Sequence, residues 1–235
     1  MQMSLAKEIQ EFFRGDIDVS DDVLEEYSRD ASLFRIKPEV VVFPKDTDDV
    51  CNLVAFVAEK KKEGRAISLT ARSAGTDMTG GPLSESIVVV FTRYMNNLKE
   101  IVGDHAVVEP GMLYRDFDAE TKKSGLILPS YPASRELCAV GGMVANNAGG
   151  EKNLKYGKTE RYVEKVTMVL HDGEPHVFSA LSEREQEKKK GEVGVEGELY
   201  RKMHELITAN YAVISKARPT VSKNSSGYNL WNVYD

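Results

Sequence analysis

The chain has 235 residues and a formal net charge of −6, and 41 % of its residues are hydrophobic. This length and composition fit one large globular domain or two small subdomains, and they exclude wholesale disorder. The acidic balance argues against a nucleic-acid partner, because a protein that binds phosphate backbones needs a basic face.

Membrane, secretion and metal signals are weak. The apolar runs are short, as in residues 87–91, whereas a membrane-spanning helix needs about 20 apolar residues. The first 13 residues contain charges and no continuous apolar stretch, so they do not resemble a signal peptide. Cys51 and Cys138 form no CxxC motif, and the four histidines are scattered. We therefore expect a cytoplasmic protein with reduced thiols, no metal site and no transmembrane segment.

Hydrophobic periodicity predicts an alternation of helices and strands. We expect helices over residues 4–14, 20–27, 47–63, 112–124 and 199–207. We expect strands over residues 40–43, 66–70, 87–91, 99–102, 106–109, 162–171 and 175–179. On the helix over residues 112–124, Leu113, Phe117 and Ala119 are predicted to face inward. The charged stretch 182–197 is predicted to be a solvated loop.

Two glycine-rich segments interrupt this pattern. The first, residues 71–81, directly follows a predicted strand, and Gly75, Gly80 and Gly81 permit a positive φ. Successive main-chain N–H groups can then converge into an anion-binding concavity, to which Arg72 would add charge. The segment fits neither the GxGxxG fingerprint of dinucleotide-binding domains nor the GxxxxGK[ST] phosphate loop of nucleoside triphosphatases. The alternative is a glycine-rich connection with no ligand.

The second segment, residues 139–150, contains two glycine pairs around Asn146 and Asn147. Its small residues would let a flat ring or a polyol chain approach the main chain, and the two amides would supply donors and acceptors. The alternative, which is credible for Gly141 and Gly142, is a tightly packed helix with small contact residues.

The order of these segments resembles the FAD-binding domain of the vanillyl-alcohol oxidase superfamily, also called the PCMH-type fold. The resemblance is carried by residues 38–44 (PEVVVFP), 72–81 (RSAGTDMTGG), 106–111 (AVVEPG), 140–150 (VGGMVANNAGG), 156–157 (YG) and 172–173 (DG). Within the superfamily the chain is most similar to the branch that contains glycolate oxidase and D-lactate dehydrogenase.

The resemblance implies an α+β fold of two α/β subdomains with FAD between them. It implies a helical segment over residues 1–35, a first FAD-binding subdomain over 36–103 and a second, incomplete one over 104–235. Some relatives attach the flavin covalently through a histidine, whose position is held here by Thr76, so non-covalent FAD is expected. The implied FAD-binding residues are Ala71, Arg72, Ser73, Ala74, Gly75, Thr76, Asp77, Ala133, Ser134, Cys138, Ala139, Gly142, Asn146, Asn147, Ala148 and Gly149.

The function that the resemblance implies is flavin-dependent oxidation of a small 2-hydroxy acid such as D-lactate or glycolate. Electrons would pass to an acceptor or an iron–sulfur partner. The segment Gly-Ser-Glu-Gly-Thr-Leu-Gly of relatives does not occur, so we expect an N-terminal portion of a longer flavoenzyme. This portion is expected to be inactive alone and to be peripheral to a membrane only through other parts. No catalytic residue is assigned. The alternatives are a non-catalytic FAD-binding subunit of a multi-subunit oxidase and a reductase of the same fold.

Overall fold

The computed structural model describes residues 3–221, 224 and 228–233. The chain divides into two compact units. Unit 1 comprises residues 1–163 and 169–175, and unit 2 comprises residues 164–168 and 176–235. The predicted division at residues 35 and 103 concerns smaller subdomains and stays a prediction.

A four-stranded sheet forms the first half of unit 1. Its order is β1 (Asp16–Asp18), β2 (Val40–Phe43), β4 (Ile87–Val90) and β3 (Leu69–Arg72). β2 and β3 both run parallel to β4, and β1 is antiparallel to β2. The strands β2 and β4 are buried along their whole length, as their continuous apolar sequences predict.

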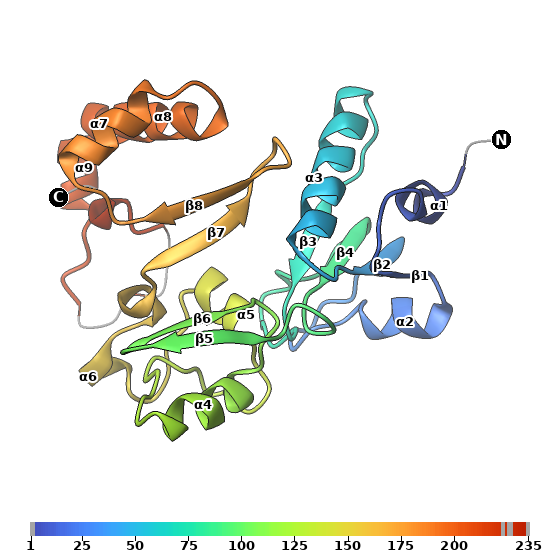
Figure 1. The fold of residues 1–235 in the computed structure, drawn as a ribbon, viewed down its shortest axis with the longest axis horizontal. Coiled ribbons are helices and arrows are strands. Elements are labelled where there is room, and N and C mark those ends of the chain that lie inside the picture. The colour runs from blue at the N-terminus through green and yellow to red at the C-terminus, as the bar shows by residue number, and fades with distance from the viewer. Residues whose placement is uncertain (1–2, 222–223, 225–227, 234–235) are drawn as a thin grey trace. The chain divides into compact units, whose positions relative to one another are not determined.

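The two faces of this sheet are covered by different helices, because successive strand residues point to opposite sides. Val40, Val42, Ile87 and Val89 belong to one apolar cluster with residues of α1 (Leu5–Gln10) and α3 (Thr47–Lys62). The alternate strand residues belong to another cluster with Leu24 of α2 (Asp21–Glu26). Figure 1 shows α1 and α3 on one side of the sheet and α2 on the other. Asp46 begins α3 as its N-cap, since its side chain accepts a hydrogen bond from the N–H of Asp49.

The second half of unit 1 has its own apolar cluster. It is built on the antiparallel hairpin of β5 (Leu98–Val102) and β6 (His105–Val108) together with α4 (Tyr114–Lys123) and α5 (Val140–Ala145). The short helices α6 (Asn153–Tyr156) and η1 (Thr159–Tyr162) follow. The predicted inner face of α4 is partly wrong: Tyr114, Phe117 and Thr121 are buried, whereas Ala119 is not. Leu113 is the N-cap and lies outside the helix, which begins at Tyr114 rather than at the predicted residue 112.

Unit 2 contains most of the hairpin of β7 (Lys165–Val169) and β8 (Pro175–Ser179) and three helices. The helices are α7 (Glu183–Gly191), α8 (Val195–Ala209) and α9 (Tyr211–Lys216), and the 3₁₀ turn η2 (Leu230–Asn232) lies near the end. The predicted loop over residues 182–197 is therefore wrong. Ser182 and Glu185 form a capping box, and glutamate and lysine are good helix formers, so an exposed helix forms without an apolar face.

Most other predicted elements are confirmed, with shifted ends. α1 is shorter than predicted, and β3 begins at Leu69 rather than residue 66 because its pairing with β4 starts there. β7 is shorter than predicted because η1 and the following residues occupy the first part of the predicted strand.

Candidate functional site

The first glycine segment begins at the carboxyl end of a parallel strand. β3 ends at Arg72, and its neighbour β4 ends at Val90, where the N–H of Phe91 donates to the carbonyl of Arg72. Loops at the carboxyl edge of parallel strands are the usual place for ligands in α/β proteins. The segment therefore lies where the topology favours a binding site.

A run of unpaired main-chain donors follows this strand. No group among the described residues accepts a hydrogen bond from the N–H groups of residues 74–78. Gly75 has φ +67°, a conformation that lets successive N–H groups converge on one anion. Gly80 also has a positive φ, +82°, as predicted, while Gly81 does not. Five neighbouring free donors with a left-handed residue among them are the features from which main-chain anion sites are built.

The carbonyl groups of the same loop show which way some of these donors point. The N–H of Ala31 donates to the carbonyl oxygens of Gly75 and Asp77, at 3.2 and 3.0 Å. In a trans peptide the following N–H points opposite to the carbonyl. The N–H groups of Thr76 and Met78 therefore both point away from Ala31.

Two side chains of the first segment are engaged within the protein. Arg72 is buried, and its guanidinium donates to the carbonyls of Arg29 and Tyr27 and lies over the Tyr27 ring. Burial lowers the pKa of Arg72. The carboxylate of Asp77 accepts from the N–H and the hydroxyl of Thr79, which closes a turn. The guanidinium of Arg72 thus donates to carbonyls of the protein itself, and the main-chain N–H groups remain as the free donors of this segment.

Residues 29–31 support this loop, and sequence reasoning missed them. Besides the Ala31 contacts, the carboxylate of Asp30 accepts from the N–H of Gly80 at 3.0 Å. The Asp30 side chain also accepts from the N–H of Ser32 at 2.8 Å, so it closes an Asx turn. The Asp-Ala-Ser sequence was the signal for that turn, but nothing in the sequence indicated which loop the turn would contact.

The second glycine segment begins as a helix, so the packed-helix alternative is correct for its first glycines. A Cβ on Gly141 would lie 2.6 Å from Pro110 Cβ, and one on Gly142 would lie 3.2 Å from Ser73 Cβ. The N–H of Gly142 donates to Ser73 Oγ at 3.3 Å. The two glycine segments are therefore in direct contact through Ser73 and Gly142.

The rest of the second segment forms a tight loop. Asn146 is exposed, Asn147 has φ +44°, and Ala148 is buried. The N–H groups of Gly149 and Gly150 have no acceptor among the described residues. This loop, like the first, presents free main-chain donors.

A buried acceptor lies beside that loop. Asn153 is 9 % exposed, and its Oδ1 has no hydrogen-bond partner among the described residues. A Cβ on Gly149 would lie 2.9 Å from this oxygen. Buried polar atoms normally find a partner, so a ligand with an N–H or O–H group would fit here.

The predicted residues 133–139 divide into two groups. Ala133 and Ser134 lie nearer the surface, and the Ser134 carbonyl accepts from the N–H groups of Leu137 and Cys138 in a local turn. Cys138 and Ala139 are buried. The Cys138 carbonyl accepts from the Tyr114 N–H, the Val140 N–H donates to the Met112 carbonyl, and Ala139 forms a β-bridge with Leu113. Burial raises the pKa of the Cys138 thiol to about 11, and both cysteines are free thiols.

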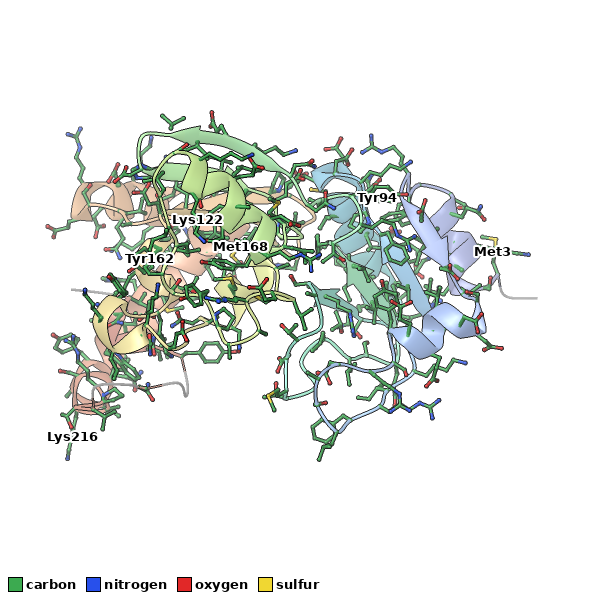
Figure 2. The ribbon with its side chains drawn as sticks, turned by 90° about the horizontal axis from the view of Figure 1, so that it is seen from below. Met3, Tyr94, Lys122, Tyr162, Met168 and Lys216 are labelled. Carbon is green, nitrogen blue, oxygen red and sulfur yellow. The ribbon has the colours of Figure 1, made fainter. Side chains whose placement is uncertain are left out.

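Two hollows among the described residues lie elsewhere. One of about 350 Å³ in unit 1 is lined by residues of α4 and by Arg135 and Glu136, and its rim includes the exposed Lys122 (Figure 2). Another of about 210 Å³ lies within unit 2. Neither includes a residue of the glycine segments, so the candidate site is described by its main-chain donors. Within residues 3–221, 224 and 228–233, no cluster of histidine, cysteine and carboxylate groups suits a metal, and no helix is long and apolar enough to cross a membrane.

These observations fit the diphosphate of a dinucleotide. A diphosphate requires several donors in a row, which residues 74–78 provide. A polyol or flat heterocycle requires a few polar partners, for which the free N–H groups of Gly149 and Gly150 and the Oδ1 of Asn153 are candidates.

Comparison with known proteins agrees with this interpretation. The family model described as "FAD binding domain" matches residues 38–179. The D-2-hydroxyglutarate dehydrogenase of Pseudomonas putida is 30 % identical over 95 % of this chain and 22 % of its own length. The D-lactate dehydrogenase of Anaerostipes hadrus is 30 % identical over 92 % of this chain and 37 % of its own length. The glycolate oxidase subunit GlcD of Bacillus subtilis is 31 % identical over 63 % of this chain and 31 % of its own length.

Solved structures share the fold. Alkyldihydroxyacetonephosphate synthase aligns with a TM-score of 0.64 at 19 % identity, covering 74 % of this chain and 34 % of the other. The 6-hydroxy-D-nicotine oxidase of Arthrobacter nicotinovorans aligns with a TM-score of 0.60 at 21 % identity, covering 71 % and 36 %. The predicted PCMH-type fold is confirmed. The chain spans less than two fifths of the length of the curated relatives named above.

Proposed function

Because the chain belongs to the family of FAD-binding domains, we propose that it holds FAD non-covalently and serves a flavin-dependent oxidation of a small 2-hydroxy acid. The single observation that carries the proposal is the run of free N–H groups at residues 74–78, in contact through Ser73 with the second glycine segment. Three relatives whose names specify oxidation of D-2-hydroxyglutarate, D-lactate or glycolate support the substrate class.

We assign the diphosphate to the main chain of residues 74–78. Ser73 and Gly142 join the two segments, and Asn146, Ala148 and Gly149 would line the second side with Asn153 as an added acceptor. Arg72, Asp77, Cys138 and Ala139 would act by holding their loops, because their side chains are buried or engaged within the protein. Ala71, Ala133 and Ser134 remain proposed lining residues.

When bound, FAD would supply the redox chemistry by accepting a hydride equivalent from the substrate carbon. This chain would bind the cofactor, fix its position and neutralise its diphosphate through main-chain donors. The two negative charges of the diphosphate favour such donors, because hydrogen bonds to charged groups are roughly twice as strong as neutral ones. We further propose an electron acceptor or an iron–sulfur partner for the reduced flavin.

The test is anaerobic reduction of the flavin. The protein at its full natural length, purified and supplied with FAD, is mixed separately with D-lactate, glycolate and D-2-hydroxyglutarate, with L-lactate as the control. Bleaching of the flavin by at least one of the first three supports the proposed substrate class. A protein that takes up no FAD would refute the cofactor, and bound FAD that none of the three acids bleaches would refute the substrate class.

A further inference from the structure

Asn147 has an unusual backbone conformation in the second glycine segment. Among the described residues it is the one non-glycine residue with positive φ. Asparagine adopts this conformation more readily than most residues, but glycine adopts it at no steric cost. Glycines occupy the nearby positions 149 and 150. An asparagine at position 147 is favoured over glycine only if its side chain makes contacts that stabilise the loop.

The Asn147 side chain is held from both ends by one residue. Its amide Nδ2 donates to Glu160 Oε2 at 2.7 Å, and its Oδ1 accepts from the main-chain N–H of Glu160 at 3.0 Å. Glu160 lies in η1, thirteen residues further along the chain. The paired bonds fix both the orientation of the amide and the distance between the loop and η1.

The next residue is fixed to the same turn. The carbonyl of Ala148 accepts from the N–H and the hydroxyl of Thr159, at 3.0 and 2.8 Å. The turn is itself braced, because the hydroxyl of Tyr162, labelled in Figure 2, donates to the carbonyl of Tyr156. Gly150 is also packed closely, because a Cβ there would lie 2.3 Å from the Tyr131 carbonyl oxygen. Residues 147–150 are thus held by contacts with η1 and with Tyr131.

We propose that Asn147 and Glu160 form a clamp that sets the main chain of residues 148–150 in its ligand-binding conformation. Asn147 is then a positioning residue, and its side chain does not contact the ligand. The free N–H groups of Gly149 and Gly150 are the groups that the clamp presents. The proposal rests on the proposed FAD site, since FAD is the ligand that these donors would meet.

The test measures FAD affinity by flavin fluorescence in five variants of the chain. Asn147→Gly keeps the backbone conformation and removes the clamp, so affinity should fall about tenfold. Glu160→Ala removes only the side-chain bond and keeps the main-chain one, so it should give a smaller loss. Glu160→Gln, which retains an acceptor, should stay within about twofold of the wild type. The double variant Asn147→Gly/Glu160→Ala should lose no more than Asn147→Gly alone, because Asn147→Gly already removes both bonds.

The matched control is Asn97→Ala. Asn97 Nδ2 donates to Glu109 Oε2 at the same 2.7 Å, in the same unit but outside the two glycine segments. The FAD affinity of the Asn97→Ala variant should stay within about twofold of the wild type. Equal losses in Asn97→Ala and Asn147→Gly would overturn the proposal, since they would show a general effect on stability.

Hydrogen exchange without FAD separates this inference from the proposed function. Removal of the clamp should make the hydrogen-bonded amides of Ala148 and Thr159 exchange at least tenfold faster while those of β2 and β4 are unchanged. If the wild type binds no FAD, the proposed function and the ligand role of the clamp both fail. If it binds FAD and Asn147→Gly and Glu160→Ala bind it equally well, the clamp alone is refuted.

Discussion

Gly75 shows most clearly why single residues matter in the first glycine segment. Its φ is +67°, and a Cβ there would lie 2.3 Å from a guanidinium nitrogen of the buried Arg72. Gly75→Val should therefore displace the free N–H groups around it and weaken FAD binding at least tenfold, about 1.4 kcal/mol. Fluorescence titration with FAD measures this change.

Gly103→Val is the matched control for Gly75→Val. Gly103 has a similar φ of +62°, but no atom lies within 4 Å of an added Cβ, and it lies in the β5–β6 hairpin turn. The Gly103→Val variant should lose stability through backbone strain and keep the FAD affinity of the wild type. Unchanged affinity in Gly75→Val would argue against the proposed role of this loop.

Cys138 provides a test through its titration. Because burial raises its pKa to about 11, roughly one thiol in a thousand is ionised at pH 8, and the thiolate is the reactive form. Alkylation of native Cys138 should be slow at pH 8 and should quicken about tenfold per pH unit up to pH 10. Peptide mapping by mass spectrometry measures the rate, with urea-unfolded protein as the control.

The same pKa shift affects stability at high pH. The Cys138 thiol has a higher pKa in the folded state than the unfolded value of about 8.5, so it contributes to the free energy of unfolding. This contribution is fully present below about pH 8.5 and is lost as the pH rises toward 11. Rapid alkylation of Cys138 in the native protein at pH 8 would show that its thiol is not buried.

At the scale of residues, the sequence predicted backbone conformation better than it predicted the contacts of side chains. The positive φ of Gly75 and Gly80 follows from glycine in a short loop, and it is confirmed. The roles of Arg72 and of Gly141 depend on partners at Arg29 and Pro110, which are distant in sequence. No local pattern contains that information.

The helix α5 illustrates how an element can require glycine for packing. A Cβ on Gly141 would lie 2.6 Å from Pro110 Cβ and 2.7 Å from the Pro110 carbonyl oxygen. Gly141→Ala should destabilise the protein by about 1–3 kcal/mol through overpacking, although helix propensity favours alanine by about 1 kcal/mol. Urea unfolding followed by circular dichroism measures the change.

Gly191 is the comparison for Gly141. It is the last residue of α7, and no atom lies within 4 Å of an added Cβ. Gly191→Ala should therefore leave stability unchanged or raise it by a few tenths of a kcal/mol to about 1 kcal/mol. A stabilising effect of Gly141→Ala would contradict the close contact between α5 and Pro110.

At the scale of elements, the buried strands were the easiest to predict. Continuous apolar runs such as VVVF and IVVV are typical of strands in a sheet that is covered on both faces. Their predicted bounds agree with those of β2 and β4 within one residue. The error over residues 182–197 has a clear cause, because a charged helix without an apolar face has no hydrophobic periodicity. Its capping box, Ser182 with Glu185, was the signal available in the sequence.

At the scale of the molecule, the two units differ in how much apolar surface they bury. The three apolar clusters of the described residues belong to unit 1. Ile207 is the one buried hydrophobic side chain in the described part of unit 2. Regions with few buried contacts open at low free energy. Amides of α8 should therefore exchange at least a hundredfold faster than those of β2 and β4, as hydrogen-exchange mass spectrometry would measure. Equal protection would show that the units open together.

The central claim is that the main-chain N–H groups of residues 74–78 hold the diphosphate of FAD. Amide resonances of a ¹⁵N-labelled chain, followed during titration with FAD and separately with riboflavin, test it directly. We predict that FAD shifts the resonances of residues 74–78 and that riboflavin, which has no diphosphate, leaves them in place. FAD that saturates the protein without shifting these five resonances would contradict the claim.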